Sequence, residues 1–191
     1  MPVDLIAFTA DRRIHGAIPL ADDRLSDMLN SVARVVVRGA TIEDLIEGGS
    51  PETADVTIPI EAIVAVLVTG RRGIQTRRRK TDHQAVRIGV VRYVVSGLLH
   101  LPAGSRLDPR ASSPGVVLAG RDRLVPLTDA TITYDNAGTT VAEAVETILV
   151  NRAQATWIEV DDGSDAVGDE LLLQRPQVYH AAMAKDLTEP R

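Results

Sequence analysis

The sequence feature that most constrains the fold is an alternating, glycine-centred pattern that occurs twice, 81 residues apart. The first occurrence spans residues 14–20 around Gly16, and the second spans residues 95–101 around Gly97. A period of two with one apolar face is typical of a half-buried antiparallel strand, and a glycine inside such a strand indicates a bend or a close backbone approach. The pattern therefore predicts two small, curved sheets of similar construction.

The match continues beyond these strands. One extra residue in the next turn aligns Arg24-Leu25 with Arg106-Leu107, and a longer loop at residues 108–124 then brings the offset to 90. We expect this offset to continue without a gap over the 34 positions from Val35 to Val68, where nine residues are identical against roughly two or three expected by chance. The identical pairs are Val35/Val125, Ala40/Ala130, Thr41/Thr131, Ile42/Ile132, Gly48/Gly138, Ala54/Ala144, Thr57/Thr147, Ile58/Ile148 and Ala65/Ala155. The sequence thus predicts an internal duplication.

We expect an all-β chain made of two tandem, small five-stranded barrel-like domains, residues 1–70 and 84–160. A basic linker at 71–83 separates them, and an acidic, then helical tail follows at 161–191. The first copy also contains a short helix near residues 21–30, with Asp22 or Asp23 as its N-cap, and Pro59 should lie at a strand end or a sheet edge. A single continuous sheet would contradict two separate domains.

Positive charge is concentrated in the linker. Its six cations are the candidate anion- or partner-binding residues: Arg71, Arg72, Arg77, Arg78, Arg79 and Lys80. Without them the chain has 15 basic and 26 acidic residues, so an acidic body carries one cationic strip. The strip is either a solvated linker or a site for phosphate contacts with nucleic acid, for which binding would be sensitive to salt. Aromatic residues are scarce, which disfavours a protein that stacks single-stranded bases.

Part of the chain resembles an uncharacterised family of small bacterial β-domains of the SH3-like and Sm-like kind. The segments that carry the resemblance are residues 97–107, the Pro126-Leu127-Thr128-Asp129-Ala130-Thr131-Ile132 strand, Val150-Asn151-Arg152, and Arg24-Leu25-Ser26-Asp27 with Leu29-Asn30 in the first copy. Each copy has about half of the family pattern. The resemblance implies a fold and no established activity. The RNA-binding residues of Sm-like barrels are not carried over, because Arg38-Gly39 lies in a different strand.

Residues that could carry chemistry are few. The absence of cysteine excludes disulfides, thiolate metal sites and cysteine nucleophiles. His15, His83, His100 and His180 lack metal-ligand spacing, and the Asp22, Asp23, Asp27 and Asn30 cluster lacks the rest of a calcium loop. Trp157 aligns with Leu67, which favours a role in core or interface packing. We find no nucleophile with its base, so we expect no enzymatic activity and no cofactor.

The favoured function is a non-catalytic scaffold or protein-interaction protein that binds a protein partner or associates with itself through strand edges. The alternative is a nucleic-acid-associated protein acting through the basic linker. An enzyme whose site forms between the copies is a third hypothesis, and a deep pocket with two carboxylates would support it. We expect a cytoplasmic location, since neither a signal peptide nor an apolar run of about 20 residues is visible.

Overall fold

The computed structural model describes residues 2–20, 24–69, 81–107 and 114–160. We call residues 2–69 the first half and residues 81–160 the second half. The first half contains β1 (Pro2–Phe8), β2 (Arg12–Pro19), α1 (Leu25–Ser31), β3 (Arg34–Asp44), β4 (Glu52–Pro59), η1 (Ile60–Ala62) and β5 (Ala65–Thr69). The second contains β6 (Thr81–Val90), β7 (Tyr93–Pro102), α2 (Pro114–Val117), β8 (Leu124–Asn136), β9 (Thr139–Asn151), η3 (Arg152–Gln154) and β10 (Ala155–Val160). The predicted all-β class is confirmed.

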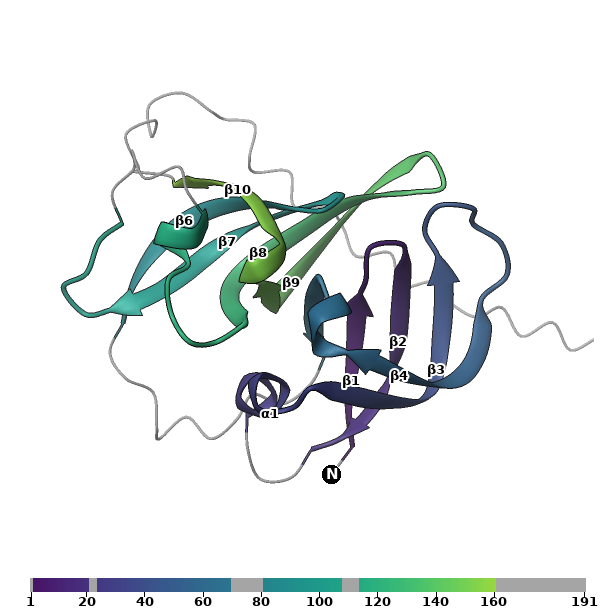
Figure 1. Cartoon of the computed structure of the whole chain (residues 1–191). Helices are drawn as coiled ribbons and strands as arrows, with labels where there is room; N and C mark the ends of the chain where they lie inside the picture. Colours follow the sequence, from purple (N-terminus) through teal and green to yellow (C-terminus); the bar gives the residue numbers. More distant parts are fainter. Residues whose placement is uncertain (1, 21–23, 70–80, 108–113, 161–191) are drawn as a thin grey trace, which may run out of the picture.

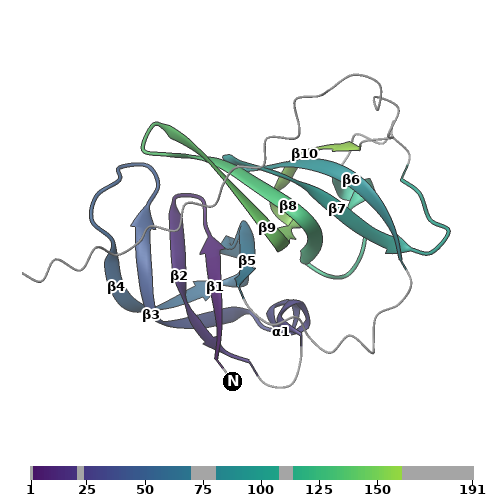
Figure 2. The ribbon, with the colours of Figure 1, turned by 180° about the vertical axis from the view of Figure 1, so that it is seen from behind.

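The strands form one antiparallel sheet of ten, in the order β10-β6-β7-β8-β9-β5-β1-β2-β3-β4. Within each half the order is the same, namely fifth, first, second, third and fourth strand. The sheet is continuous because β5 pairs with β9, with Ala65–Leu67 opposite Ile148–Val150 (Figures 1 and 2). The structure therefore does not show two separate five-stranded barrels, because an edge strand of each half has found its partner in the other half.

The halves also agree in register over three strands. Ile14 lies opposite Ile42 in the first half, and Val95 lies opposite Ile132 in the second. Both β2 and β7 have a register shift at their central glycine, Gly16 or Gly97. A Cβ on Gly97 would lie 2.9 Å from the Ala130 Cβ, so the predicted close approach is real. Pro59 is the last residue of the edge strand β4, as expected.

The predicted gapless offset of 90 holds in β3 and β8 but not beyond them. Val35 lies opposite Ile58, whereas Val125 lies opposite Val150. Ile58 therefore corresponds to Val150, so the offset there is 92. The cause is a bulge in β3 between Val37 and Ala40 that β8 lacks, together with a longer second hairpin. The identities after Gly48/Gly138 are thus displaced by one or two residues, and Trp157 corresponds to Ala65 rather than to Leu67.

Each half surrounds its own apolar core, and both cores extend across the junction. Leu5 and Ala7 face the first-half core, while Ile6 and Phe8 on the opposite face of β1 enter the second-half core. Leu149 of β9 enters the first-half core. Strands buried on both faces have continuous apolar runs rather than alternation. This is why β1, β5 and the end of β9 have such runs.

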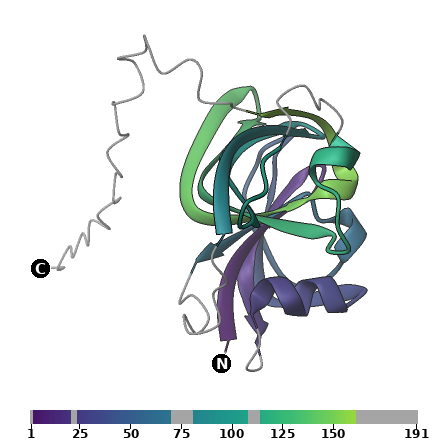
Figure 3. The same ribbon diagram turned by 90° about the vertical axis from the view of Figure 1, so that its left-hand side faces the viewer.

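A short helix closes each half (Figure 3). Leu25 and Leu29 of α1 are buried in the first-half core, and Val117 at the end of α2 is buried in the second. The expected side-chain cap of α1 is not seen: its N-cap residue is Arg24, which makes no capping hydrogen bond. Asp22 and Asp23 lie outside the described residues.

Candidate functional site: the junction between the halves

The six cations of the predicted site lie outside the described residues, as does the predicted tail at 161–191. The described chain stops at the end of β5 and resumes with Thr81 in β6, so residues 81–83 of the predicted linker belong to a strand. The candidate site is therefore built from the contacts between the halves.

A buried asparagine organises the backbone of the junction. Asn151 is fully buried, and its backbone N–H donates to the Val64 carbonyl at 2.9 Å. Its side-chain amide donates to the Ile63 carbonyl at 2.7 Å, while its Oδ1 accepts from the Ala153 N–H at 3.1 Å. Because a buried polar group is costly without partners, these bonds hold the end of β9 in one position against β5.

Three aromatic rings fill the junction beside this strand pair. Phe8 lies 5.4 Å from Tyr93 and 5.2 Å from Tyr134, measured between ring centroids, and the two tyrosine rings are 5.9 Å apart. Tilted and edge-on arrangements at such distances are favourable for aromatic pairs. Phe8 comes from β1 and both tyrosines come from the second half, so the cluster joins the halves.

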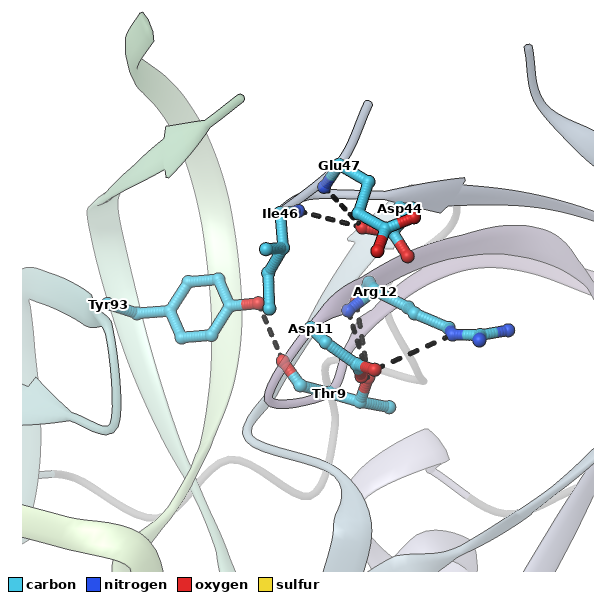
Figure 4. Close-up of polar contacts among 7 residues, drawn as sticks. All are labelled: Thr9, Asp11, Arg12, Asp44, Ile46, Glu47 and Tyr93. Atoms are coloured by element: carbon cyan, nitrogen blue, oxygen red, sulfur yellow. Dashed lines mark hydrogen bonds and ion pairs between the residues drawn. The ribbon is translucent and has the colours of Figure 1, made fainter. Parts of the chain in front are cut away.

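The Tyr93 hydroxyl connects this cluster to a polar turn. It donates to the Thr9 carbonyl at 2.6 Å, and the Thr9 hydroxyl donates to Asp11 at 3.0 Å (Figure 4). Nearby, one Asp44 oxygen accepts the backbone N–H groups of Ile46 and Glu47, at 2.8 and 2.9 Å. The Glu47 N–H, followed by that of Ile46, lowers the pKa of Asp44. The two bonds to Asp44 fix the conformation of the turn after β3.

We predict an alkaline loss of stability from Tyr93. Burial raises the pKa of Tyr93 from 10.0 to about 12, so its stabilising contribution is complete below pH 10 and is lost as the pH rises towards 12. The free energy of unfolding, measured in denaturant titrations between pH 9 and 12, should fall in this window. The free energy of unfolding of Tyr93→Phe should fall less steeply over the same pH range. Equal slopes for the two proteins would contradict the assignment.

Three turns meet at the same end of the junction. Arg92, between β6 and β7, donates to the Asp135 carbonyl at 2.8 Å, and the Ala137 N–H donates to the Leu45 carbonyl at 3.0 Å. Two apolar side chains beside these contacts stay exposed, Ile46 at 61% and Val91 at 51%. Val91 has a φ of 54°, which is unfavourable for a β-branched residue. The contacts between the turns hold it in that conformation.

A charged cluster links the outer strands of the junction. Arg13 of β2 lies 3.2 Å from Glu43 and 3.4 Å from Glu143, and the Tyr134 hydroxyl donates to Glu143 at 2.5 Å. Burial, followed by this bond, raises the pKa of Tyr134. The hypothesis of an enzyme site between the copies calls for two carboxylates in a deep pocket, and Glu43 and Glu143 supply two carboxylates. One guanidinium lies between the two carboxylates and balances one of their two negative charges, so the arrangement acts as a clamp between the halves.

Sequence reasoning missed three further contacts, all of which involve His100. His83 and His100 lie on paired strands with ring centroids 4.4 Å apart. His100 is also within 3.2 Å of the Thr81 hydroxyl and 2.8 Å of the Thr128 hydroxyl. No sequence signal indicated the contact between the two histidines, because His83 belongs to the predicted basic linker and His100 lies near the end of the strand predicted around Gly97. In the described ranges no three His, Cys, Asp or Glu side chains gather as a metal site.

Trp157 is 39% exposed rather than buried. Its indole lies over Gly89, and the Arg87 guanidinium is 5.8 Å from its ring centroid. We predict that Gly89→Ala displaces the indole, because the new Cβ would lie 2.0 Å from the indole nitrogen. The emission of Trp157, the single tryptophan, should shift to the red, at a cost of about 1 kcal/mol or less because the ring can move into solvent. An unaltered spectrum for Gly89→Ala would contradict the prediction.

Comparison with known proteins assigns no family. No family pattern, curated protein or solved structure matches the chain. The resemblance to small bacterial β-domains therefore stays an expectation. None of the helices in the described part of the chain has the length and apolar character to cross a bilayer.

Proposed function

We propose that the chain is a non-catalytic scaffold or protein-interaction protein made of two five-stranded modules that arose by duplication. The shared strand order and the matching bulges at Gly16 and Gly97 support the duplication. The observation that carries the function is the pairing of β5 with β9, because it is an instance of one module binding the edge strand of another. Strand addition at a sheet edge is a common mode of protein recognition.

The edge strand β4 is the binding surface in this proposal. Val56–Ile58 of β4 correspond to Ile148–Val150 of β9, the residues that pair with β5. In the ten-stranded sheet β4 pairs only with β3, so its other side is open to an added strand. A partner segment would lie on β4 in the place that β5 takes on β9.

The partner is a different protein rather than a second copy. A second copy would offer β10 to β4, and the aromatic cluster of the junction has no equivalent there. In a contact between β4 and the β10 of a second copy, Gly89 would take the position that Phe8 has in the junction. Arg12 and Asp44 would take the positions of Tyr93 and Tyr134. The outer edges thus lack the apolar contacts that seal the junction, in the way that natural sheet edges avoid self-association.

The test compares two edge variants of the full chain. Thr57→Lys puts a charge on the free edge, and Thr139→Lys is the control, an exposed residue at the tip of the β8–β9 hairpin. Affinity purification should recover a partner with the wild type and the control but not with Thr57→Lys, and light scattering should show a monomer. If Thr57→Lys still recovered the partner, the interface would lie elsewhere. A wild-type protein that is monomeric and recovers no partner would contradict the proposed function.

The second candidate function is nucleic-acid binding through Arg71, Arg72, Arg77, Arg78, Arg79 and Lys80, favoured by their concentration in an otherwise acidic chain. Such binding would weaken steeply between low and moderate salt because phosphate contacts release counterions. Titration of a generic duplex at two salt concentrations tests it. Binding that does not change with salt, or that survives replacement of Arg77, Arg78 and Arg79 by glutamine, would exclude it.

A further inference from the structure

A hollow of about 410 Å³ opens at the junction, at the end where α1 meets the second half. Volumes of this size accommodate small molecules. Its lining comes from both halves and consists of Asn30, Ser31, Val32, Ala33, Ile60, Glu61, Arg121 and Arg123. Neither half would form it alone.

Hydrogen bonds fix the walls of this hollow. The Asn30 amide donates to the Leu124 carbonyl at 3.0 Å and accepts the Leu124 N–H at 2.8 Å, which fastens α1 to the start of β8. The Ile60 N–H donates to the Ala33 carbonyl at 3.0 Å, and the Gln154 side-chain amide donates to the Glu61 carbonyl. The first-half wall of the hollow is thus held in place before any ligand arrives.

The charges at the rim are unbalanced. Among the described residues, none makes a side-chain hydrogen bond or ion pair with Arg121 or Arg123, and the same holds for Arg24, Arg34, Arg38 and Arg106. Glu61 is the one acidic residue in the lining. Ile60, which is buried, also lines the hollow. Two arginines that have no ion-pair partner among the described residues therefore line this hollow, in a protein of net charge −5.

We propose that this junction hollow binds the oxyanion group, carboxylate or phosphate, of a small molecule. A guanidinium presents paired N–H donors that match the two oxygens of either group, and a charged hydrogen bond of this kind is stronger than a neutral one. Glu61 opposes the anion and so limits its affinity. This site is separate from the β4 edge and does not depend on the proposed function.

The experiment titrates the isotope-labelled full chain with inorganic phosphate and, separately, with succinate, and follows amide chemical shifts at constant ionic strength. Saturable changes should occur at Asn30–Ala33, Ile60 and Glu61. Arg121→Gln with Arg123→Gln should weaken binding roughly tenfold or more, and Glu61→Gln should strengthen it. The probe with the lower dissociation constant identifies the preferred group.

Two controls make the outcome decisive. Arg87→Gln removes an exposed arginine away from the hollow, and the triple replacement of Arg77, Arg78 and Arg79 by glutamine removes competing cations; both should bind as the wild type does. Three results would each overturn the proposal: no saturable change with either probe, binding unaffected by the Arg121/Arg123 double variant, or binding lost in the triple variant. An unchanged thermal midpoint confirms that the double variant is folded.

Discussion

Replacing Phe8 with alanine is expected to lower the free energy of unfolding by about 3–5 kcal/mol. Phe8 is fully buried, and its ring contacts both Tyr93 and Tyr134 of the other half. The substitution removes apolar contact and leaves a cavity between rings that are held by their own strands, so the site cannot collapse fully. The effect should reach both halves, because Phe8 belongs to a strand of the first and to the core of the second.

Denaturant unfolding followed by circular dichroism measures this loss. Val36→Ala is the control, since Val36 is exposed and should change stability by about 0.5 kcal/mol or less. Wild type and Phe8→Ala should each unfold in one transition, because the two cores share residues. Two separate transitions in the wild type, or a loss below about 1 kcal/mol for Phe8→Ala, would mean that the junction does not couple the halves.

Adding one methyl group at either central glycine is the second large effect that we expect. In Gly16→Ala the new Cβ would lie 2.6 Å from Val37 Cγ1 and 3.1 Å from the Ala40 Cα. In Gly97→Ala it would lie 2.9 Å from the Ala130 Cβ and 3.0 Å from the Thr128 carbonyl oxygen. Backbone atoms on the neighbouring strand cannot move aside as the end of a flexible side chain can. Each substitution should therefore cost about 1–3 kcal/mol.

Ser96→Ala is the matched control, because it changes an exposed residue next to Gly97 in the same strand. Its free energy of unfolding should stay within about 0.5 kcal/mol of the wild type. If either glycine variant were equally neutral, the bulge at that position would be loose rather than tightly packed. A loss at one glycine only would show that the two bulges, alike in register, differ in packing.

Much of the strand pattern was accessible from local sequence. The alternation around Gly16 and Gly97 predicted β2 and β7, and Pro59 predicted a strand end, which is the end of β4. The gapless alignment failed after β3 because a bulge adds a residue without changing the apolar pattern around it. Bulge positions depend on the opposing strand, which a one-dimensional comparison does not contain.

The junction was not predicted, although a signal was present. The unbroken apolar runs of β1 and β5 indicate burial on both faces, which an isolated five-stranded domain does not require. The contact of Arg13 with Glu143 and that of Asn30 with Leu124 join residues far apart in the chain. No periodicity or spacing connects such residues.

By itself the sequence determined the all-β class, the strand content of each half and the glycine bends, because alternation and backbone freedom are local properties. Only the tertiary structure decided that β9 would pair with β5, that the two cores would share residues, and that Arg121 and Arg123 would meet α1 around one hollow. The physical reason is that edge strands offer the same backbone hydrogen bonds to any partner. The side chains that favour one partner strand over another come into contact only when the chain has folded.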